Sequence, residues 1–259
     1  MRRTPPICLL LAIVLCLSAI QAGAQNTPNA ALLLHPEKAF LPPSTATANF
    51  VVSVDGQPLS YAAPQILFFK TGSDADFIAG VWKDAAGKVV HQREVLIVKP
   101  DYGIVVDHIY GSQQHDVSST VELDILKSKN EGNITLVSLK SGCEFAIQTL
   151  RPPESPISYI PSNPTDKRVP SETSRLTLPI PVAAVFFPIT QPTATLKIEF
   201  VKPTNPMIVK CKVTLAGGRV DEVGIAWESR ELHLGGKAFK GWAAVLRQGP
   251  DSAGDIEIK

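Results

Sequence analysis

Residues 91–110 read HQREVLIVKPDYGIVVDHIY, and they indicate the fold class most clearly. Two apolar runs, Val95–Val98 and Ile104–Val106, flank a turn that contains Pro100 and Gly103. Proline fits the first central position of a type I turn, and glycine adopts the left-handed backbone region most readily. Two β-branched runs on either side of such a turn are typical of a β-hairpin.

The charges within this hairpin predict the length of its loop. A two-residue turn at Pro100 and Asp101 would set Glu94 opposite Asp107, and like charges directly opposed destabilise a sheet. We therefore expect a four-residue loop with Gly103 in the left-handed region.

Short apolar runs continue on both sides of the hairpin. Alternation is clear where Val209, Cys211 and Val213 face one way and Lys210 and Lys212 the other. This pattern is typical of antiparallel strands with one wet face. Strands are expected at residues 50–54, 66–70, 77–82, 89–98, 104–109, 117–126, 134–139, 145–149, 182–187, 195–202, 208–215, 220–227, 231–234, 239–246 and 256–258. The fold class predicted is all-β, an antiparallel β-sandwich over residues 48–259.

The N-terminus predicts export. Arg2 and Arg3 precede an apolar run, Ile7–Ile20, and a small-residue site that ends at Ala24. This is the pattern of a signal peptide over residues 1–24, and an uncleaved anchor is the alternative. We expect a secreted or periplasmic protein with no membrane attachment after cleavage, and residues 25–47 as a lead-in. Loss of the two arginines changes the formal charge from +1 to −1, which argues against nucleic acid as a partner.

Residues 151–192 interrupt the strand pattern with ten prolines. Proline donates no ladder hydrogen bond and is confined to sheet edges and turns. We expect a long surface excursion with one strand, Val182–Phe187, inside it. A linker between two domains is the alternative.

Two cysteines, Cys143 and Cys211, remain after signal cleavage. Export meets an oxidising compartment, so they are candidates for a disulfide, and two buried free thiols are the alternative. No spacing typical of a metal site is present, and no phosphate-binding or nucleophile motif indicates a cofactor or a catalytic serine.

The hairpin resembles a segment of the heparinase II/III-like polysaccharide lyases. In their β-sandwich domain this segment reads approximately H-x-R-x-V-hydrophobic-K-P-x-Y-hydrophobic-D, followed by a glycine and a histidine. Here Arg93–Asp107 reads REVLIVKPDYGIVVD, followed by Gly111 and His115. Phe77–Gly80 and Val185–Pro188 are similar to flanking segments of the family.

Those lyases join the sandwich to a catalytic α/α-toroid and cleave uronate-containing polysaccharides by β-elimination. The strand pattern of residues 25–259 leaves no room for a toroid, and the family's His-x-His-x-Asp-Ala stretch is missing. The resemblance therefore implies the sandwich fold, with acidic polysaccharide or a separate catalytic subunit as partner. No residue is assigned a catalytic role.

The resemblance and the residue types give five candidates for a binding site: His91, Arg93, Tyr102, Asp107 and His115. For Arg93 and Asp107, a structural ion pair is the favoured alternative, because a buried carboxylate needs a partner. Arg93 and His108 are the nearest donors expected for Asp107. For His91, which matches a family position near a metal site, a hydrogen-bonded strand residue is favoured over a metal ligand.

Two further sets of side chains suit a glycan. Aromatic faces stack on sugar rings, and the candidates are Tyr102, Tyr110, Trp82, Trp227 and Trp242, with core packing favoured for the last two. A basic patch would form if the strands that carry Lys197, Lys202, Lys210 and Lys212 were neighbours, although interspersed acids should dilute it.

Three functions follow from these observations. The first is an exported non-catalytic module that binds acidic polysaccharide or supports a lyase. The second is a reduced lyase that uses His91 or His115 with Tyr102 or Tyr110. The third is a structural or protein-interaction domain whose contact surface is the proline-rich segment.

Overall fold

The computed structural model describes residues 49–55, 57–58, 65–83, 90–99, 101–112, 114–122, 125–131, 134–139, 144–150, 168–177, 180–188, 197–201, 205–215, 217–249 and 254–259. All of these residues lie in strands and the turns between them. Within them there is no helix, and hence none long and apolar enough to cross a membrane. The signal peptide, the lead-in and Cys143 lie outside the described residues, and so does most of the proline-rich segment before β11.

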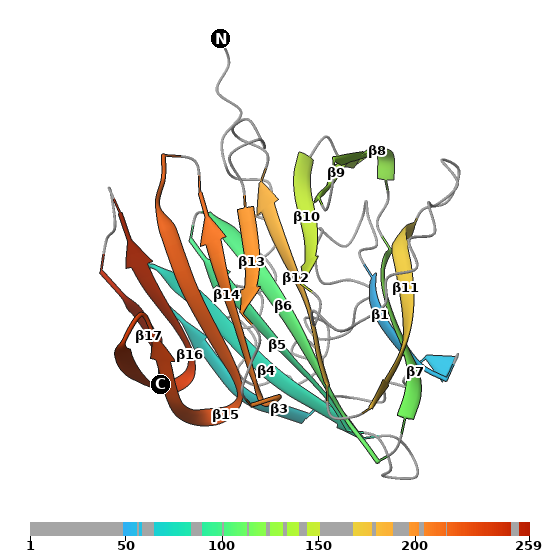
Figure 1. Cartoon of the computed structure of the whole chain (residues 1–259), viewed down its shortest axis with the longest axis horizontal. Helices are drawn as coiled ribbons and strands as arrows, with labels where there is room; N and C mark the ends of the chain where they lie inside the picture. The colour runs from blue at the N-terminus through green and yellow to red at the C-terminus, as the bar shows by residue number, and fades with distance from the viewer. Residues whose placement is uncertain are drawn as a thin grey trace, which may run out of the picture.

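The described strands form three antiparallel sheets (Figure 1). The first has eight strands in the order β3 (Gln65–Thr71), β4 (Ala75–Lys83), β5 (Val90–Val98), β6 (Tyr102–Tyr110), β12 (Ile180–Pro188), β10 (Glu144–Leu150), β9 (Ile134–Leu139) and β8 (Ile125–Glu131). The second has five strands in the order β13 (Lys197–Val201), β14 (Ile208–Thr214), β15 (Val220–Leu234), β16 (Lys237–Gln248) and β17 (Ile256–Ile258). The third has four strands in the order β11 (Arg168–Thr177), β7 (Gln114–Glu122), β1 (Asn49–Val54) and β2 (Gln57–Pro58).

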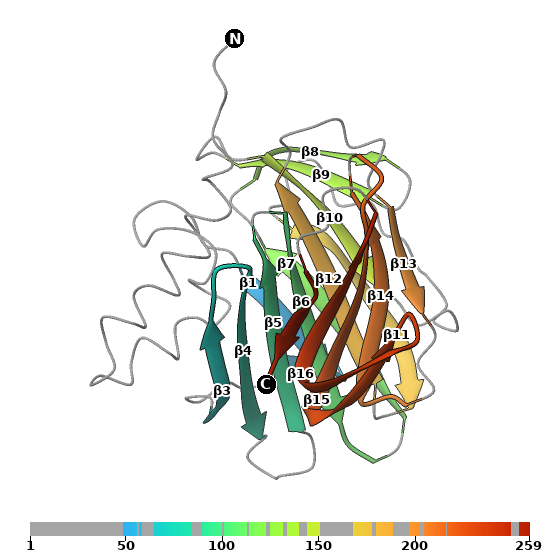
Figure 2. The ribbon, with the colours of Figure 1, turned by 90° about the vertical axis from the view of Figure 1, so that its left-hand side faces the viewer.

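The eight-stranded and five-stranded sheets pack face to face (Figure 2). One cluster of buried residues joins them, with Leu96 and Ile104 from one sheet and Val209, Val213 and Val223 from the other. Alternate residues on each strand point into this cluster, as the period of two predicts. The prediction of an all-β, antiparallel sandwich is confirmed.

The loop of the central hairpin differs from the expected four residues. Val98 pairs with Tyr102, so only three residues connect β5 and β6, and Gly103 lies inside β6 opposite Ile97. Asp101 N donates to Val98 O at 2.8 Å and closes the turn. This register sets Arg93 opposite Asp107. A three-residue loop therefore keeps Glu94 and Asp107 from facing each other, and Gly103 does not need a left-handed backbone.

The proline-rich segment contains more of the sandwich than expected. β12 is not a surface strand: it pairs with β6 on one side and β10 on the other, and Val185 is fully buried. β11, which was not expected, forms the edge of the four-stranded sheet. Its register shifts between Val169 and Glu172, the position of Pro170, so the proline lies where a ladder bond is dispensable.

The β15–β16 hairpin folds back over the outer face of its own sheet (Figure 2). Leu232, Leu234 and Phe239 from its far end form a second buried cluster that includes residues near its base. The turn joins Leu234 to Lys237 through two glycines, both with positive φ, at 51° and 83°. That is the backbone of a type I′ turn. Gly224 leaves room for this return, since an added Cβ would lie 3.3 Å from Leu234.

Candidate functional site

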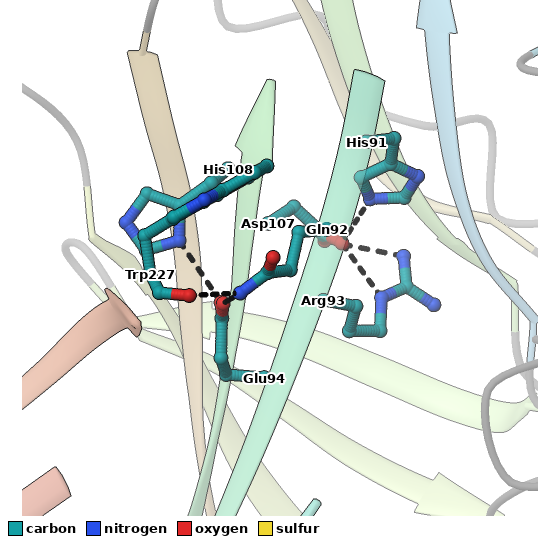
Figure 3. Close-up of polar contacts among 7 residues, drawn as sticks. All are labelled: His91, Gln92, Arg93, Glu94, Asp107, His108 and Trp227. Carbon is teal, nitrogen blue, oxygen red and sulfur yellow. Dashed lines mark hydrogen bonds and ion pairs between the residues drawn. The ribbon is translucent and has the colours of Figure 1, made fainter. Parts of the chain in front are cut away.

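Strand alternation divides the polar residues of the central hairpin between two faces of one sheet (Figure 3). Leu96 and Ile104 point toward the five-stranded sheet, so Gln92, Glu94 and His108 share that side. The remaining polar residues, His91, Arg93 and Asp107, lie on the opposite face. Neighbouring positions in the sequence therefore build two separate networks.

The first network surrounds Asp107. Arg93 Nε donates to Asp107 Oδ1 at 2.7 Å and Arg93 Nη2 to Oδ2 at 3.1 Å, while His91 Nε2 lies 2.5 Å from Oδ1. The His91 ring stacks on the Trp82 ring with centroids 5.1 Å apart. All three polar side chains are buried, with exposed fractions of 0–3%.

Electrostatics keep the Asp107 carboxylate charged. Burial alone would raise the pKa of Asp107, but Arg93 and then His91 outweigh it and hold that pKa below its usual range. Burial lowers the pKa of His91, against the attraction of Asp107. At neutral pH the imidazole is thus neutral and donates from Nε2 to the carboxylate.

The second network surrounds Glu94 and reaches the other sheet. His108 Nδ1 lies 2.9 Å from Glu94 Oε2, and Gln92 Nε2 donates to Glu94 Oε1 at 2.5 Å. Gln92 Nε2 also lies 2.5 Å from the carbonyl oxygen of Trp227 on β15. Burial raises the pKa of Glu94, and the histidine and the amide oppose that rise.

The loop end of the hairpin is also held by a buried polar network. Tyr102 is buried, and its hydroxyl donates to Asp221 Oδ2 at 3.0 Å on β15. Arg219 donates to Asp221 and to Asp101 of the hairpin loop. Burial, followed by the charge of Asp221, raises the pKa of Tyr102 well above its usual value.

Lys99 fixes the other side of the same loop. Its ammonium lies 2.7 Å from Asp76 Oδ2 and donates to Gly72 O at 2.8 Å, both on or before β4. The lysine and the tyrosine of the motif therefore hold the hairpin to a neighbouring strand and to the facing sheet. These side chains therefore stabilise the fold through their interactions.

The five candidate binding residues do not form one surface. His91, Arg93, Tyr102 and Asp107 are buried, and Tyr102 lies on the opposite face from the other three. His115 lies apart on β7, where its ring nitrogens meet Asp55 Oδ2 at 2.7 Å and Ser112 O at 2.9 Å. The ion pair between Arg93 and Asp107, favoured from the sequence, is present.

Cys211 lies in the core as a free thiol whose pKa burial raises to about 12. Its expected disulfide partner, Cys143, lies outside the described residues. Among the residues that the structure describes, no three His, Cys, Asp or Glu side chains gather as metal ligands would. His91 and Asp107 supply two such groups, and Arg93 lies where a cation would be repelled.

The lysine-bearing strands are neighbours, as a basic patch requires. Glu199 pairs with Lys212 across β13 and β14, and Val201 pairs with Lys210. Carboxylates neutralise much of the charge, since Lys197 contacts Glu199 and Lys212 Nζ lies 3.0 Å from Glu222. Lys202 lies outside the described residues. Charge alone therefore does not mark this face as a glycan site.

The five aromatic candidates for stacking on a sugar differ in how deeply they are buried. Trp82 is buried, and Trp242 packs on the sandwich core with its ring stacked 5.5 Å from Phe68. Trp227 and Tyr110 remain partly exposed and contact each other, with ring centroids 4.4 Å apart. The apolar strand around Trp227 predicted that its side chain would be buried in the core, and this prediction is wrong. A bulge in β15 cannot be recognised from the alternation of residues.

The structure resembles solved polysaccharide lyases. A heparinase III shares 13% sequence identity at a TM-score of 0.52, over 68% of this chain and 30% of that chain. The heparan sulfate lyase HepC from Pedobacter heparinus shares 13% identity at a TM-score of 0.51, over 68% and 30%. No protein-family model and no curated protein matches the chain. The resemblance expected from the hairpin is thus confirmed for the fold, and the matched part of this chain spans 30% of each lyase.

Proposed function

We propose that the protein is an exported, non-catalytic β-sandwich module that binds acidic, uronate-containing polysaccharide or supports a separate polysaccharide lyase. The observation that carries the proposal is the burial of the hairpin residues that resemble the motif of the lyase sandwich. The shared part is a scaffold, and two solved lyases use a similar sandwich as 30% of their chains.

The contacts of these residues support a role without catalysis. β-Elimination needs a base and an acid within hydrogen-bond reach of the substrate. His91 and Tyr102, one of the four pairings expected for a reduced lyase, are 1% exposed and lie on opposite faces of one sheet. Their polar atoms bind Asp107 and Asp221 instead.

Affinity electrophoresis of residues 25–259 through gels with heparan sulfate, alginate, pectin or a neutral glucan tests the binding. We expect one uronate polymer to retard the protein, and added salt to weaken the retardation because the contact is partly ionic. Unchanged mobility in every gel would contradict polysaccharide binding and favour an interaction domain.

The same polymers test for catalysis. A rise in ultraviolet absorbance on incubation would reveal an unsaturated uronate product and would make the protein a reduced lyase. His115, whose side chain is 20% exposed, would then be the first residue to substitute.

A further inference from the structure

Trp227 lies in a bulge of β15 and is partly exposed. The register against β16 shifts between Ile225 and Arg230, which frees the intervening backbone from regular pairing. Trp227 N donates to Met207 O at 3.0 Å, and Trp227 O accepts from Gln92 Nε2 at 2.5 Å. The backbone N–H of Trp227 is therefore fixed to its own sheet, and its carbonyl oxygen is fixed to the facing sheet. Figure 3 draws the second of these contacts.

The indole ring is also fixed by its neighbours. Tyr110 meets it at a centroid distance of 4.4 Å and an interplanar angle of 56°, and His108 meets it edge to face at 5.7 Å. His108 is 1% exposed and is itself bound to Glu94. Trp227 and Tyr110 are partly exposed, so a preorganised aromatic surface reaches solvent. A rigid surface loses little conformational entropy when a ligand binds.

Charged groups border this aromatic pair. Glu228 and Arg230, on the same bulge, form an ion pair and have side chains that are 60% and 25% exposed. Burial raises the pKa of the Tyr110 hydroxyl, Arg230 lowers it and Glu228 raises it, so both charges lie within electrostatic reach of that hydroxyl. An aromatic face beside a carboxylate, a guanidinium and a phenol offers stacking together with hydrogen-bond donors and acceptors.

The surroundings favour a sugar over a protein surface. Among the described residues, the exposed large hydrophobic side chains are Leu67 and Val201, on the edge strands β3 and β13. Neither belongs to β6 or β15, so the described large hydrophobic side chains of those two strands are at most partly exposed. A protein interface has a larger apolar centre, whereas one sugar ring is covered by one or two aromatic rings.

We propose that Trp227 and Tyr110 form the saccharide-stacking platform of this module, and that Arg230 contacts an acidic group of the sugar. This site rests on the proposed polysaccharide binding and names the surface that performs it. The C–H face of a pyranose ring stacks on the indole, and ring hydroxyls reach Glu228 and the Tyr110 hydroxyl. The guanidinium binds the carboxylate or sulfate as a charge-assisted pair.

Substitution of the two partly buried tryptophans tests the platform. Trp227→Leu removes the stacking surface but keeps an apolar side chain, and Trp242→Leu makes the same change in the sandwich core as the matched control. In the gel with the uronate polymer that retards the wild type, we expect Trp227→Leu to weaken binding about tenfold. Trp242→Leu should bind like the wild type at a temperature where both variants are folded by circular dichroism.

Two further variants complete the test. Tyr110→Leu decides the matter if Trp227→Leu does not fold, and it should also weaken binding. Arg230→Gln should lower the affinity for the acidic polymer and reduce its dependence on salt.

Equal retardation of Trp227→Leu, Tyr110→Leu and the wild type would overturn the platform and leave polysaccharide binding at another surface. No retardation of the wild type in any gel would overturn the platform and the proposed function together.

Discussion

Asp107 illustrates how individual side chains of the hairpin serve the fold. Its carboxylate is fully buried, and two nitrogens of Arg93 and one of His91 bind it. A buried charge is tolerated only when neighbouring groups neutralise it and form hydrogen bonds with it. Loss of one partner leaves the remaining charge buried and unpaired. The sequence indicated that Asp107 would need donors and named Arg93, which is correct. It also named His108, which is wrong, because His108 lies on the other face of the sheet and contacts Glu94 instead.

Replacement of Asp107 by asparagine should destabilise the protein strongly. Asp107→Asn keeps the shape of the side chain but leaves the Arg93 guanidinium buried without its counter-charge. We expect a loss of about 3–5 kcal/mol in the free energy of unfolding, measured by urea denaturation. Glu222→Gln is the control, because the partner of Glu222, Lys212, is 44% exposed. The control should cost less than about 1 kcal/mol, and equal losses in both variants would refute the structural role.

His115 makes a contribution to stability that depends on pH. Its two nitrogens face Asp55 Oδ2 and Ser112 O, both acceptors, and only the imidazolium donates to both. The hydrogen bond to Asp55, followed by that to Ser112, raises the pKa of His115. The stabilisation is therefore complete below the unfolded pKa of about 6.5 and is lost as pH rises through the folded value.

Urea denaturation of the wild type and His115→Gln at about pH 5.5 and about pH 9 measures this contribution. The wild type should be more stable than the variant at the lower pH, and the difference should shrink at the higher pH. A difference that is the same at both values would mean that the protonated ring does not hold the turn after β1.

At the scale of elements, most strands follow from alternation and β-branched residues. β9 and β17 coincide with the expected ranges, residues 134–139 and 256–258. β11 was missed because its residues, RVPSETSRLT, are polar and interrupted by proline, and its pairing with β7 is a long-range contact. The predicted length of the central hairpin loop was wrong by one residue. The repulsion between Asp107 and Glu94 excludes only the register in which they face each other, so it does not specify one loop length.

Glycine at one position of β16 is required by the approach of another strand. An added Cβ on Gly241 would lie 2.0 Å from the carbonyl oxygen of Ile258 on β17. Backbone cannot rotate away as a side chain can, so Gly241→Ala should displace β17 and lower the free energy of unfolding by about 1–3 kcal/mol.

Gly224→Ala provides the comparison for thermal unfolding. Its added Cβ would lie 3.3 Å from Cδ2 of Leu234, a terminal atom that can shift. Gly241→Ala should therefore unfold at the lower temperature of the two. The reverse order would show that β17 is not packed against Gly241.

At the scale of the whole molecule, polar networks join the two layers of the sandwich at both ends of the central hairpin. One runs from Gln92 to Trp227, and the other from Tyr102 to Asp221. The sequence identified Tyr102 and Trp227 by type but not their partners, because β6 and β15 are more than a hundred residues apart in the chain. The binding site was predicted from motif residues that turned out to be buried.

Tyr102→Phe tests the bond between the layers. The change removes only the hydroxyl that donates to Asp221 Oδ2 at 3.0 Å, while the ring keeps its packing against Phe187. Asp221 is fully buried and retains Arg219, so the aspartate stays paired but loses one donor. A hydrogen bond to a charged group contributes about 1.5–3 kcal/mol, and urea denaturation should record a loss of that size. A loss near zero would mean that Arg219 alone satisfies Asp221 and that apolar packing holds the two sheets together at this end.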